Sequence, residues 1–306
     1  MNRYHIVHKT IYKYQKPVTL SHNEGHLLPC DTEDQICESA ALRVDPAPAV
    51  SDERRDIYGN RVNYFSLEEP HKLIEVVAES WIRRSVTQRV PLDAGRRAAA
   101  AEAAPAWENA RDELTASADA AMLQEYVFAS PMITADAIDS PGVDAFARSV
   151  FTPGRSLLAA CIDLNARIFN EFQYDSGFST IGTPLSKVLK HKRGVCQDFA
   201  HLFLACVRRM GLPGRYASGY LETKPPPGRP RLQGADASHA WASVFIPGPD
   251  GGWLDFDPTN NLIAGNEHIV LGYGRDYSDV TPLKGVIFGG GKHTVRVEVD
   301  VIPVED

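Results

Sequence analysis

The chain has 306 residues, 43% of them apolar, which is enough for one large or two medium domains with hydrophobic cores. Its formal net charge of −7 argues against a nucleic-acid partner and against binding to anionic membranes. The five cysteines are irregularly spaced and odd in number, so we expect no disulfide framework. Because no signal peptide or transmembrane stretch is visible, we expect a cytoplasmic protein with free thiols.

The first eighty-odd residues are typical of an antiparallel β domain. Apolar and polar residues alternate from Tyr4 to Tyr14, as in a strand with one buried face. The pair Gly59-Asn60 separates two strand-like runs, which predicts a hairpin turn. A run rich in β-branched residues follows from His71. We assign residues 1–92 to this N-terminal domain.

Residues 93–306 form the second predicted domain. Helical periodicity is clearest from Leu157 to Phe169 and again after Cys196. Strand-like segments then return, separated by a Pro-rich loop that starts at Pro225, and the last of them alternates from His293 to Val304. An order of strands, then helices, then strands predicts the α+β class rather than alternating βαβ units.

A helix is predicted to begin at Cys196. Gly194 breaks the preceding turn, apolar residues follow at helical spacing, and Gly211-Leu212-Pro213 ends the element. Cys196 would then lie in the first turn, where free N–H groups and the helix dipole favour a thiolate. The same N–H groups can donate to an oxyanion on an acyl group bound to the sulfur. Cys196 is therefore the candidate nucleophile.

A cysteine nucleophile needs a base that removes its proton, and a third group that orients the base. Among ten histidines we favour His239, which lies on a predicted strand beside the small residues Ser238 and Ala240. Asp257 ends the next predicted strand, where catalytic groups often emerge, and it can orient the ring. Asp255 lies two residues earlier on the same strand face and competes for this role.

Three motifs carry a resemblance to a known family. GVCQDFAH, SHAWASVF and GWLDFDPTN resemble, in this order, the Cys, His and Asp motifs of the transglutaminase-like superfamily. The stretches YKYQKPVTLSHNEGHLLP and DIYGNRVNYFSLEEPH resemble the N-terminal β region of bacterial transglutaminase-like proteins. The resemblance covers nearly the whole chain. It implies a papain-like core with Cys196 as nucleophile, His239 as base and acid, and Asp257 as the orienting carboxylate.

The implied activity is cysteine-dependent acyl transfer on amide or peptide bonds through a thioester. With water as acceptor the protein would be a peptidase or amidase; with an amine it would be a transglutaminase or an amide ligase. We favour hydrolysis, because water is abundant and cross-linking needs a dedicated amine site. A non-catalytic interaction module is a further alternative, against which the presence of all three residues counts. The expected partner is a peptide or protein amide substrate.

Two departures from related enzymes concern the oxyanion. Ala160 stands where animal transglutaminases place a Trp, and the sequence LKHKR stands where papain places a Gln, so the second oxyanion donor is not identified. No acidic loop of the calcium-ligand type is present, and we predict no cofactor.

Side chains near the candidate residues also have simpler interpretations. His191 and His201 flank Cys196 and could form a metal site with it, but His201 is rotated by roughly 140° from Cys196 on a helix and does not share its face. Asp198 is expected to serve the helix terminus. Trp241 could either shield the site from water or be a core aromatic residue.

Overall fold

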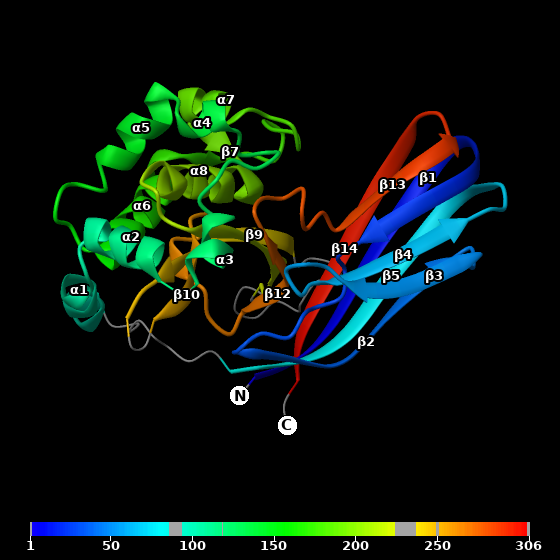
Figure 1. Cartoon of the computed structure of the whole chain (residues 1–306). Helices are drawn as coiled ribbons and strands as arrows, with labels where there is room; N and C mark the ends of the chain where they lie inside the picture. The colour runs from blue at the N-terminus through cyan, green and yellow to red at the C-terminus, as the bar shows by residue number, and fades with distance from the viewer. Residues whose placement is uncertain (1, 86–93, 118, 224–236, 249–250, 305–306) are drawn as a thin grey trace, which may run out of the picture.

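The computed structural model describes residues 2–85, 94–117, 119–223, 237–248 and 251–304. The expected domain boundary at residue 92 and the Pro-rich loop from Pro225 lie outside the described residues. A seven-stranded sheet forms one unit, and a five-stranded sheet with the helices forms the other (Figure 1). The predicted α+β class is confirmed.

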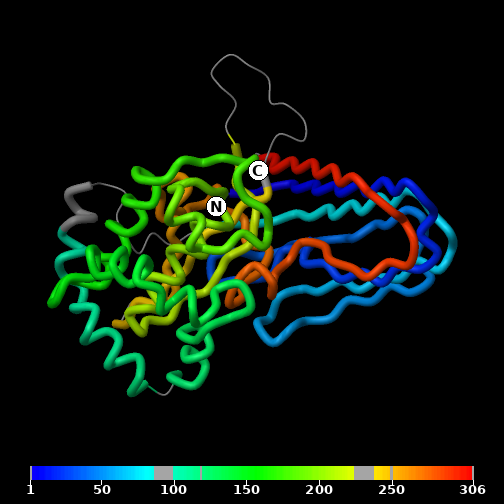
Figure 2. Tube along the Cα trace, turned by 90° about the horizontal axis from the view of Figure 1, so that it is seen from above, coloured from blue at the N-terminus to red at the C-terminus, as the bar shows by residue number. Residues whose placement is uncertain are grey.

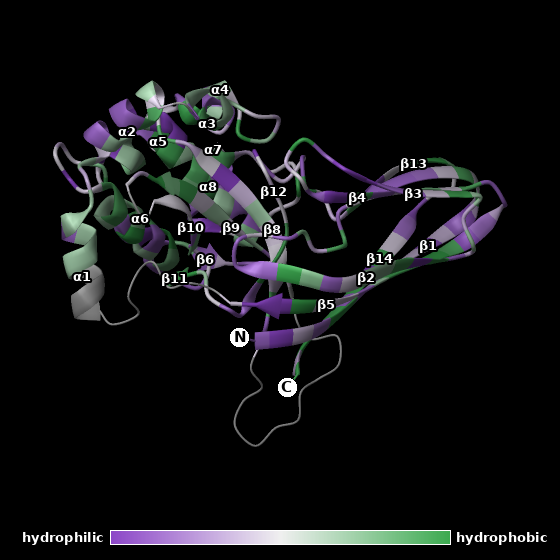
Figure 3. Cartoon of the chain, turned by 60° about the horizontal axis from the view of Figure 1, so that its bottom comes forward, coloured by the Kyte–Doolittle hydropathy of each residue, from purple (hydrophilic) through white to green (hydrophobic). Residues whose placement is uncertain are grey.

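The long strand β1, Asn2–Gly25, pairs with four of the other six strands of the seven-stranded antiparallel sheet. From Tyr4 to Thr10 every second side chain is buried, because successive side chains of a strand point to opposite faces. Figure 3 shows hydrophilic and hydrophobic bands along the strands of this sheet. The other strands of this sheet are β2 (Gln35–Asp45), β3 (Val50–Arg55), β4 (Arg61–Leu67), β5 (His71–Arg84), β13 (Leu283–Gly289) and β14 (His293–Val304).

The hairpin predicted at Gly59-Asn60 is confirmed: β3 and β4 pair antiparallel on either side of it. Gly59 has a φ of +82°, a left-handed conformation that favours glycine. The Asp56 carboxylate accepts the Asn60 backbone N–H at 2.9 Å. Asn60 also donates its side-chain amide to the Tyr273 carbonyl at 2.7 Å, so the tip of the hairpin is fixed to the second unit.

The last two strands return to the first sheet. β14 pairs with the first part of β1, from Arg3 opposite Val304 to Tyr14 opposite His293, and β13 pairs with the second part. Chain order places residues 283–304 in the predicted domain 93–306, but their backbone partners lie in β1. Every strand must pair its N–H and C=O groups, and alternation alone does not tell which partner it finds.

The second unit consists of an antiparallel sheet in the order β11-β10-β9-β8-β12 and the helices that cover it. Its strands are β8 (Gly214–Leu221), β9 (Ala237–Ile246), β10 (Gly252–Asp257), β11 (Leu262–Ile263) and β12 (His268–Gly274). The helices are α1 (Ala94–Ala103), α2 (Trp107–Ala116), α3 (Ala120–Gln124), α4 (Ala135–Ile138), α5 (Pro141–Arg148), α6 (Leu157–Glu171), α7 (Leu185–His191) and α8 (Cys196–Arg209). β6 (Gln173–Tyr174) and β7 (Arg193–Gly194) form a short parallel pair.

Helix α8 lies at the centre of the second unit. Every side chain from Asp198 to Arg208 is buried, and the helix packs against β9, α5 and α6. This burial fixes the position of the first turn, because the rest of the helix cannot move without disturbing a close-packed core. None of the described helices is long and apolar enough to cross a membrane.

A second core joins the two units, which lie end to end in Figure 2. It combines side chains of β1 and β14 with side chains of β8 and β12: Tyr4, Ile6, Val299, Val301, Tyr220, Ile269 and Leu271. Within it the Tyr220 hydroxyl is 2.8 Å from Nδ1 of His8, so a buried hydrogen bond also spans the junction. The N-terminal sheet is thereby packed rigidly onto the sheet that carries His239 and Asp257.

Candidate active site

Cys196 is the first residue of α8, as predicted, and its side chain is partly exposed. The Asp198 carboxylate accepts the Val195 backbone N–H at 2.8 Å and the Ser179 hydroxyl at 2.5 Å. Asp198 therefore caps the start of its own helix, which is the role expected for it. The first-turn N–H groups at Cys196 have no acceptor within the helix and remain available to an anion at the sulfur.

The segment before Cys196 is held in place by backbone hydrogen bonds. β7 pairs with β6, and the Asp175 N–H donates to the Gly194 carbonyl at 2.8 Å. Gly194 is required at this point of the chain, because a Cβ atom there would lie 2.8 Å from the Cβ of Asp198. The chain thus enters α8 in one direction, which sets where the thiol lies.

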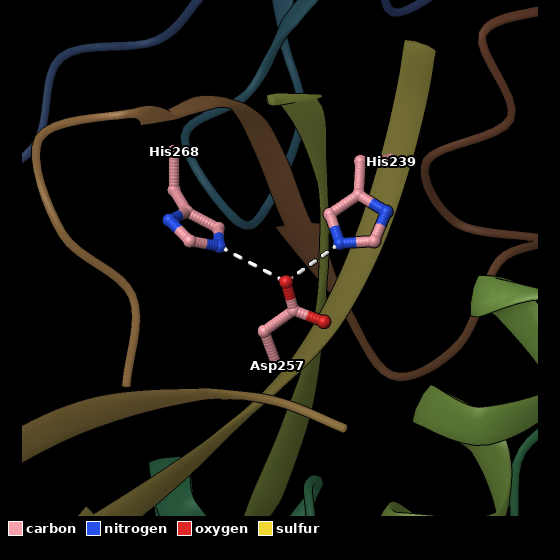
Figure 4. Close-up of side chains that lie close together, drawn as sticks. All are labelled: His239, Asp257 and His268. Atoms are coloured by element: carbon pink, nitrogen blue, oxygen red, sulfur yellow. Dashed lines mark hydrogen bonds and ion pairs between the residues drawn. The ribbon is translucent and has the colours of Figure 1, made fainter. Parts of the chain in front are cut away.

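His239 and Asp257 come from the neighbouring antiparallel strands β9 and β10. Nε2 of His239 lies 2.8 Å from Oδ2 of Asp257 (Figure 4). The histidine is 8% exposed and the carboxylate is fully buried. At this distance and burial the contact is a strong, charge-assisted hydrogen bond.

The Asp257 carboxylate accepts hydrogen bonds at both oxygens. Oδ1 accepts the backbone N–H groups of Thr259 and Asn260 at 3.0 and 3.2 Å, and Oδ2 accepts the Asn260 side-chain amide at 2.8 Å. Burial disfavours the charged form, but the hydrogen bonds and charges of His239 and His268 outweigh it. They hold the pKa of Asp257 well below its ordinary range.

His268, at the start of β12, is a site residue that sequence reasoning missed. Its Nε2 lies 3.1 Å from Oδ2 of Asp257, on the other side of the carboxylate from His239 (Figure 4). The Gly265 backbone N–H donates to Nδ1 of His268 at 3.2 Å. Because Nδ1 accepts, the proton of the neutral ring is on Nε2 and points at Asp257. No motif around His268 distinguishes it from the other histidines.

Two groups of side chains near the site have the residue types of a metal centre. Among the described residues, His239, Asp257 and His268 each offer one ligand atom, all within 4.8 Å of one another. A metal at Nε2 of His268 would need a lone pair there, but the N–H of Gly265 facing Nδ1 demands the opposite tautomer. The trio therefore fits hydrogen bonding better than metal binding. The second group, His191 and His201 with Cys196, is not assembled: Nε2 of His201 accepts the Tyr277 N–H at 3.2 Å instead.

His239 also interacts with Cys196. Burial alone would lower the pKa of the ring, but hydrogen bonds with Asp257 and with the Cys196 side chain, together with the charges of both groups, raise it to about 10. Since Nε2 is engaged with Asp257, Nδ1 is the nitrogen left for the sulfur. In Figure 4 this atom points away from the carboxylate. Asp257 and Cys196 therefore both act on the ring of His239.

Asp255, the competing carboxylate, has other partners. Its Oδ2 accepts Nε1–H of Trp241 at 2.9 Å and the Tyr273 hydroxyl at 3.2 Å. Trp241 is fully buried, and its ring centroid lies 6.0 Å from that of His239 and 5.2 Å from that of His268. Trp241 is therefore a core aromatic residue that lies beside both imidazole rings.

Comparison with known proteins identifies two family regions in the chain and two relatives that match nearly all of it. Residues 4–83 match the bacterial transglutaminase-like N-terminal region, and residues 144–258 match the transglutaminase-like superfamily. Uncharacterized protein Rv2569c of Mycobacterium tuberculosis is 40% identical over 308 residues, which cover 99% of this chain and 94% of the relative. Uncharacterized protein ML0607 of Mycobacterium leprae is 32% identical over 305 residues, which cover 98% of this chain and 99% of the relative.

The chain belongs to the transglutaminase-like superfamily. Members of this superfamily are typically cysteine-dependent enzymes. A crystal structure from Cytophaga hutchinsonii, named provisionally as a cysteine protease, has a TM-score of 0.74 at 19% identity and aligns over 100% of this chain and 91% of its own. The alignment spans both units, so the predicted fold, a transglutaminase-like core with an N-terminal antiparallel sheet, is confirmed.

Ala160 and Gln197 are the first positions to consider for a second oxyanion donor. Ala160 is fully buried in α6 and has no side-chain donor. Gln197 donates its side-chain amide to the Ile181 carbonyl at 3.2 Å, so this donor is already engaged. Tyr174, on β6, is 55% exposed. Burial and, next, the charge of Cys196 raise the pKa of its hydroxyl, which therefore keeps its proton.

Proposed function

We propose that this protein hydrolyses amide or peptide bonds through a thioester on Cys196. The observation that carries the proposal is the placement of His239, whose Nε2 lies 2.8 Å from Oδ2 of Asp257 and whose pKa is raised by Asp257 and by Cys196. An imidazole that a carboxylate orients and that interacts with a thiol is the arrangement that activates a cysteine nucleophile. The catalytic assignment of Cys196, His239 and Asp257 also fits the match of residues 144–258 to the superfamily core.

The reaction follows from these positions. The Cys196 thiolate attacks the amide carbonyl, and a carbon–sulfur bond forms while negative charge develops on the oxygen. First-turn N–H groups of α8 stabilise that charge. His239 gives its Nδ1 proton to the leaving amine as the carbon–nitrogen bond breaks. A water molecule then attacks the thioester, His239 takes its proton, and the acid leaves as the carbon–sulfur bond breaks. Asp257 keeps the ring oriented throughout.

We favour hydrolysis over transfer to an amine, because water is always present whereas an acceptor amine needs its own binding site. The substrate we propose is a peptide or protein amide. We also propose a cytoplasmic location, which is supported by the five cysteines, all described and none in a disulfide.

The test is a screen of peptides and amide conjugates with and without an added amine, read by mass spectrometry. We expect an acid product in water, and a loss of turnover of at least about 10³-fold in Cys196→Ala. Cys37→Ala, which alters a partly exposed cysteine of the N-terminal sheet, is the matched control and should retain activity. Retained activity in Cys196→Ala would contradict the proposal, and product formation only with amine would assign the chain to acyl transfer.

The same protein samples also test the alternative that the chain is a non-catalytic interaction module. An imidazolium beside the sulfur should let iodoacetamide label Cys196 well below pH ~8, where ordinary thiols react slowly. His239→Ala should slow this labelling to the rate of Cys37. Labelling of the unchanged protein at that ordinary rate, with no turnover of any substrate, would favour the interaction module.

A further inference from the structure

A cavity of about 560 Å³ lies where the two units meet. The N-terminal unit contributes the loop at residues 30–34, the β3–β4 turn and the end of β5. The second unit contributes β8, the start of β10 and β12. Its volume is that of a small-molecule pocket, and such pockets are common at domain junctions. None of Cys196, His239 and Asp257 lines it, so it is separate from the proposed active site.

Arg215 of β8 enters this cavity between two aromatic rings. Its guanidinium carbon is 3.5 Å from the centroid of Tyr273 and 4.2 Å from that of Trp253. Nε donates to the Ser243 hydroxyl at 3.3 Å. The two rings cover the guanidinium and the serine occupies Nε, so the free hydrogen-bonding positions are on the terminal nitrogens. No carboxylate among the described residues forms an ion pair with them. A rigid guanidinium edge of this kind suits a planar acceptor such as a carboxylate.

Arg84 lines the same cavity and is 4% exposed. It donates only to neutral acceptors, the Gly265 carbonyl at 3.3 Å and Oε1 of Gln35 at 3.4 Å. Within the described part of the chain it also forms no ion pair. A buried arginine without a counter-charge is unusual, because removing a charge from water is costly. Arg84 and Arg215 both line this cavity, from the N-terminal unit and the second unit respectively.

The remaining lining limits the kind of anion. Four carboxylates, Asp31, Glu33, Asp34 and Asp255, also border the cavity, and Arg55 pairs with Asp31 at 3.9 Å. Their charges disfavour an anion that carries several charges, such as phosphate. Phe245, Trp253 and Tyr58 provide aromatic surface. We propose that this cavity binds a monocarboxylate with an apolar body, its carboxylate held by Arg215 and Arg84. The ligand is either a free small acid or the carboxyl end of a peptide, because both present the same chemistry.

The test uses isothermal titration calorimetry on the full chain carrying Cys196→Ala, so that binding is measured without turnover and independently of the proposed activity. The probes are N-acetylphenylalanine and its amide. We expect the acid to bind and the amide to bind at least roughly tenfold more weakly, since it lacks the charge that the arginines recognise. Ala-Ala-Phe with a free or an amidated carboxyl end distinguishes a peptide end from a free small acid. Inorganic phosphate should bind more weakly than N-acetylphenylalanine.

Arg215→Gln should weaken binding of the acid at least roughly tenfold. Arg43→Gln is the matched control, because Arg43 is an exposed arginine of β2 that pairs with Glu79, and neither residue lines the cavity. Thermal melting of each variant shows that it is folded. Equal binding of acid and amide, equal binding by the Arg215→Gln protein, or no binding of the acid or the free peptide at millimolar concentration would each overturn the proposal.

Discussion

Asp257 holds the His239 ring at one of its two nitrogens, and this determines which proton the ring can move. Asp257 engages Nε2, so the proton exchanged with sulfur, amine or water is the one at Nδ1. Because the pKa of His239 is raised to about 10, the charged ring stabilises the folded state fully below its unfolded value of 6.5. That stabilisation is lost as the pH rises through about 10.

In the proposed mechanism Asp257 is an orienting group rather than a proton acceptor. Its two oxygens receive donors from Thr259, Asn260, His239 and His268. A carboxylate with so many donors is stabilised in its charged form and has little tendency to take a proton from the ring. The mechanism therefore needs Asp257 only as a fixed negative charge.

His268 is predicted to position Asp257 through the proton on its Nε2. His268→Phe removes that donor, and we expect kcat to fall about 10- to 100-fold with little change in KM, the effect of losing one hydrogen bond to a charged group. His268→Gln keeps a nitrogen donor and should recover most of the rate. We would measure kcat and KM by steady-state kinetics on the substrate found in the screen. Melting temperatures would show that each variant is folded. Equal losses in both variants would contradict a donor role.

His268 is also the site residue that could not be predicted from the sequence. Cys196, His239 and Asp257 stand in motifs with turn residues and small neighbours that point to them. His268 stands at the start of an apolar strand. Its side chain reaches Asp257 although β8 and β9 lie between β12 and β10 in the sheet, and no local pattern indicates this contact. The choice of Asp257 over Asp255 was likewise open, since both lie on one strand face, and only the partners Trp241 and Tyr273 distinguish Asp255.

At the scale of elements, the start of α8 is the decisive feature. The helix begins where Gly194 and the capping Asp198 fix it, and both of its ends were predictable because breakers and caps are local properties of the sequence. Because the rest of the helix is buried, the position of its first turn, and with it the position of Cys196, is fixed.

Gly194→Ala should disturb that start. A methyl group would lie 2.8 Å from Cβ and 2.9 Å from Oδ2 of Asp198, so the cap must shift. We expect the free energy of unfolding to fall by about 1–3 kcal/mol and kcat/KM to fall as Cys196 moves. Gly182→Ala is the control, because nothing lies within 4 Å of the Cβ it would add. Urea unfolding and kinetics compare the two, and identical behaviour would show that Gly194 is not needed.

At the scale of the whole molecule, the main consequence of the strand pairing is the hydrophobic core that the two units share. Alternation in residues 293–304 predicts a strand, but its partner β1 lies almost three hundred residues away in sequence, and no local pattern specifies that pairing. The two units therefore could be predicted separately, whereas their junction could not.

The junction predicts that both units unfold together. Val301→Ala removes buried surface from the shared core and should cost about 2 kcal/mol, in a single transition seen by both tryptophan fluorescence and circular dichroism. Val297, on the same strand and 48% exposed, gives the control Val297→Ala, which should change stability by less than about 0.5 kcal/mol. Two separate transitions, or equal effects of both variants, would contradict a shared core.

The pairing of β14 with β1 also sets an order of events during synthesis. A polypeptide emerges from the ribosome amino end first, and many domains fold as soon as their residues are out of the exit tunnel. In this chain the opening strand cannot find one of its two neighbours until residues 293–304 have been translated. Until then one edge of the nascent sheet stays unpaired, which makes this edge a natural place for a chaperone to act.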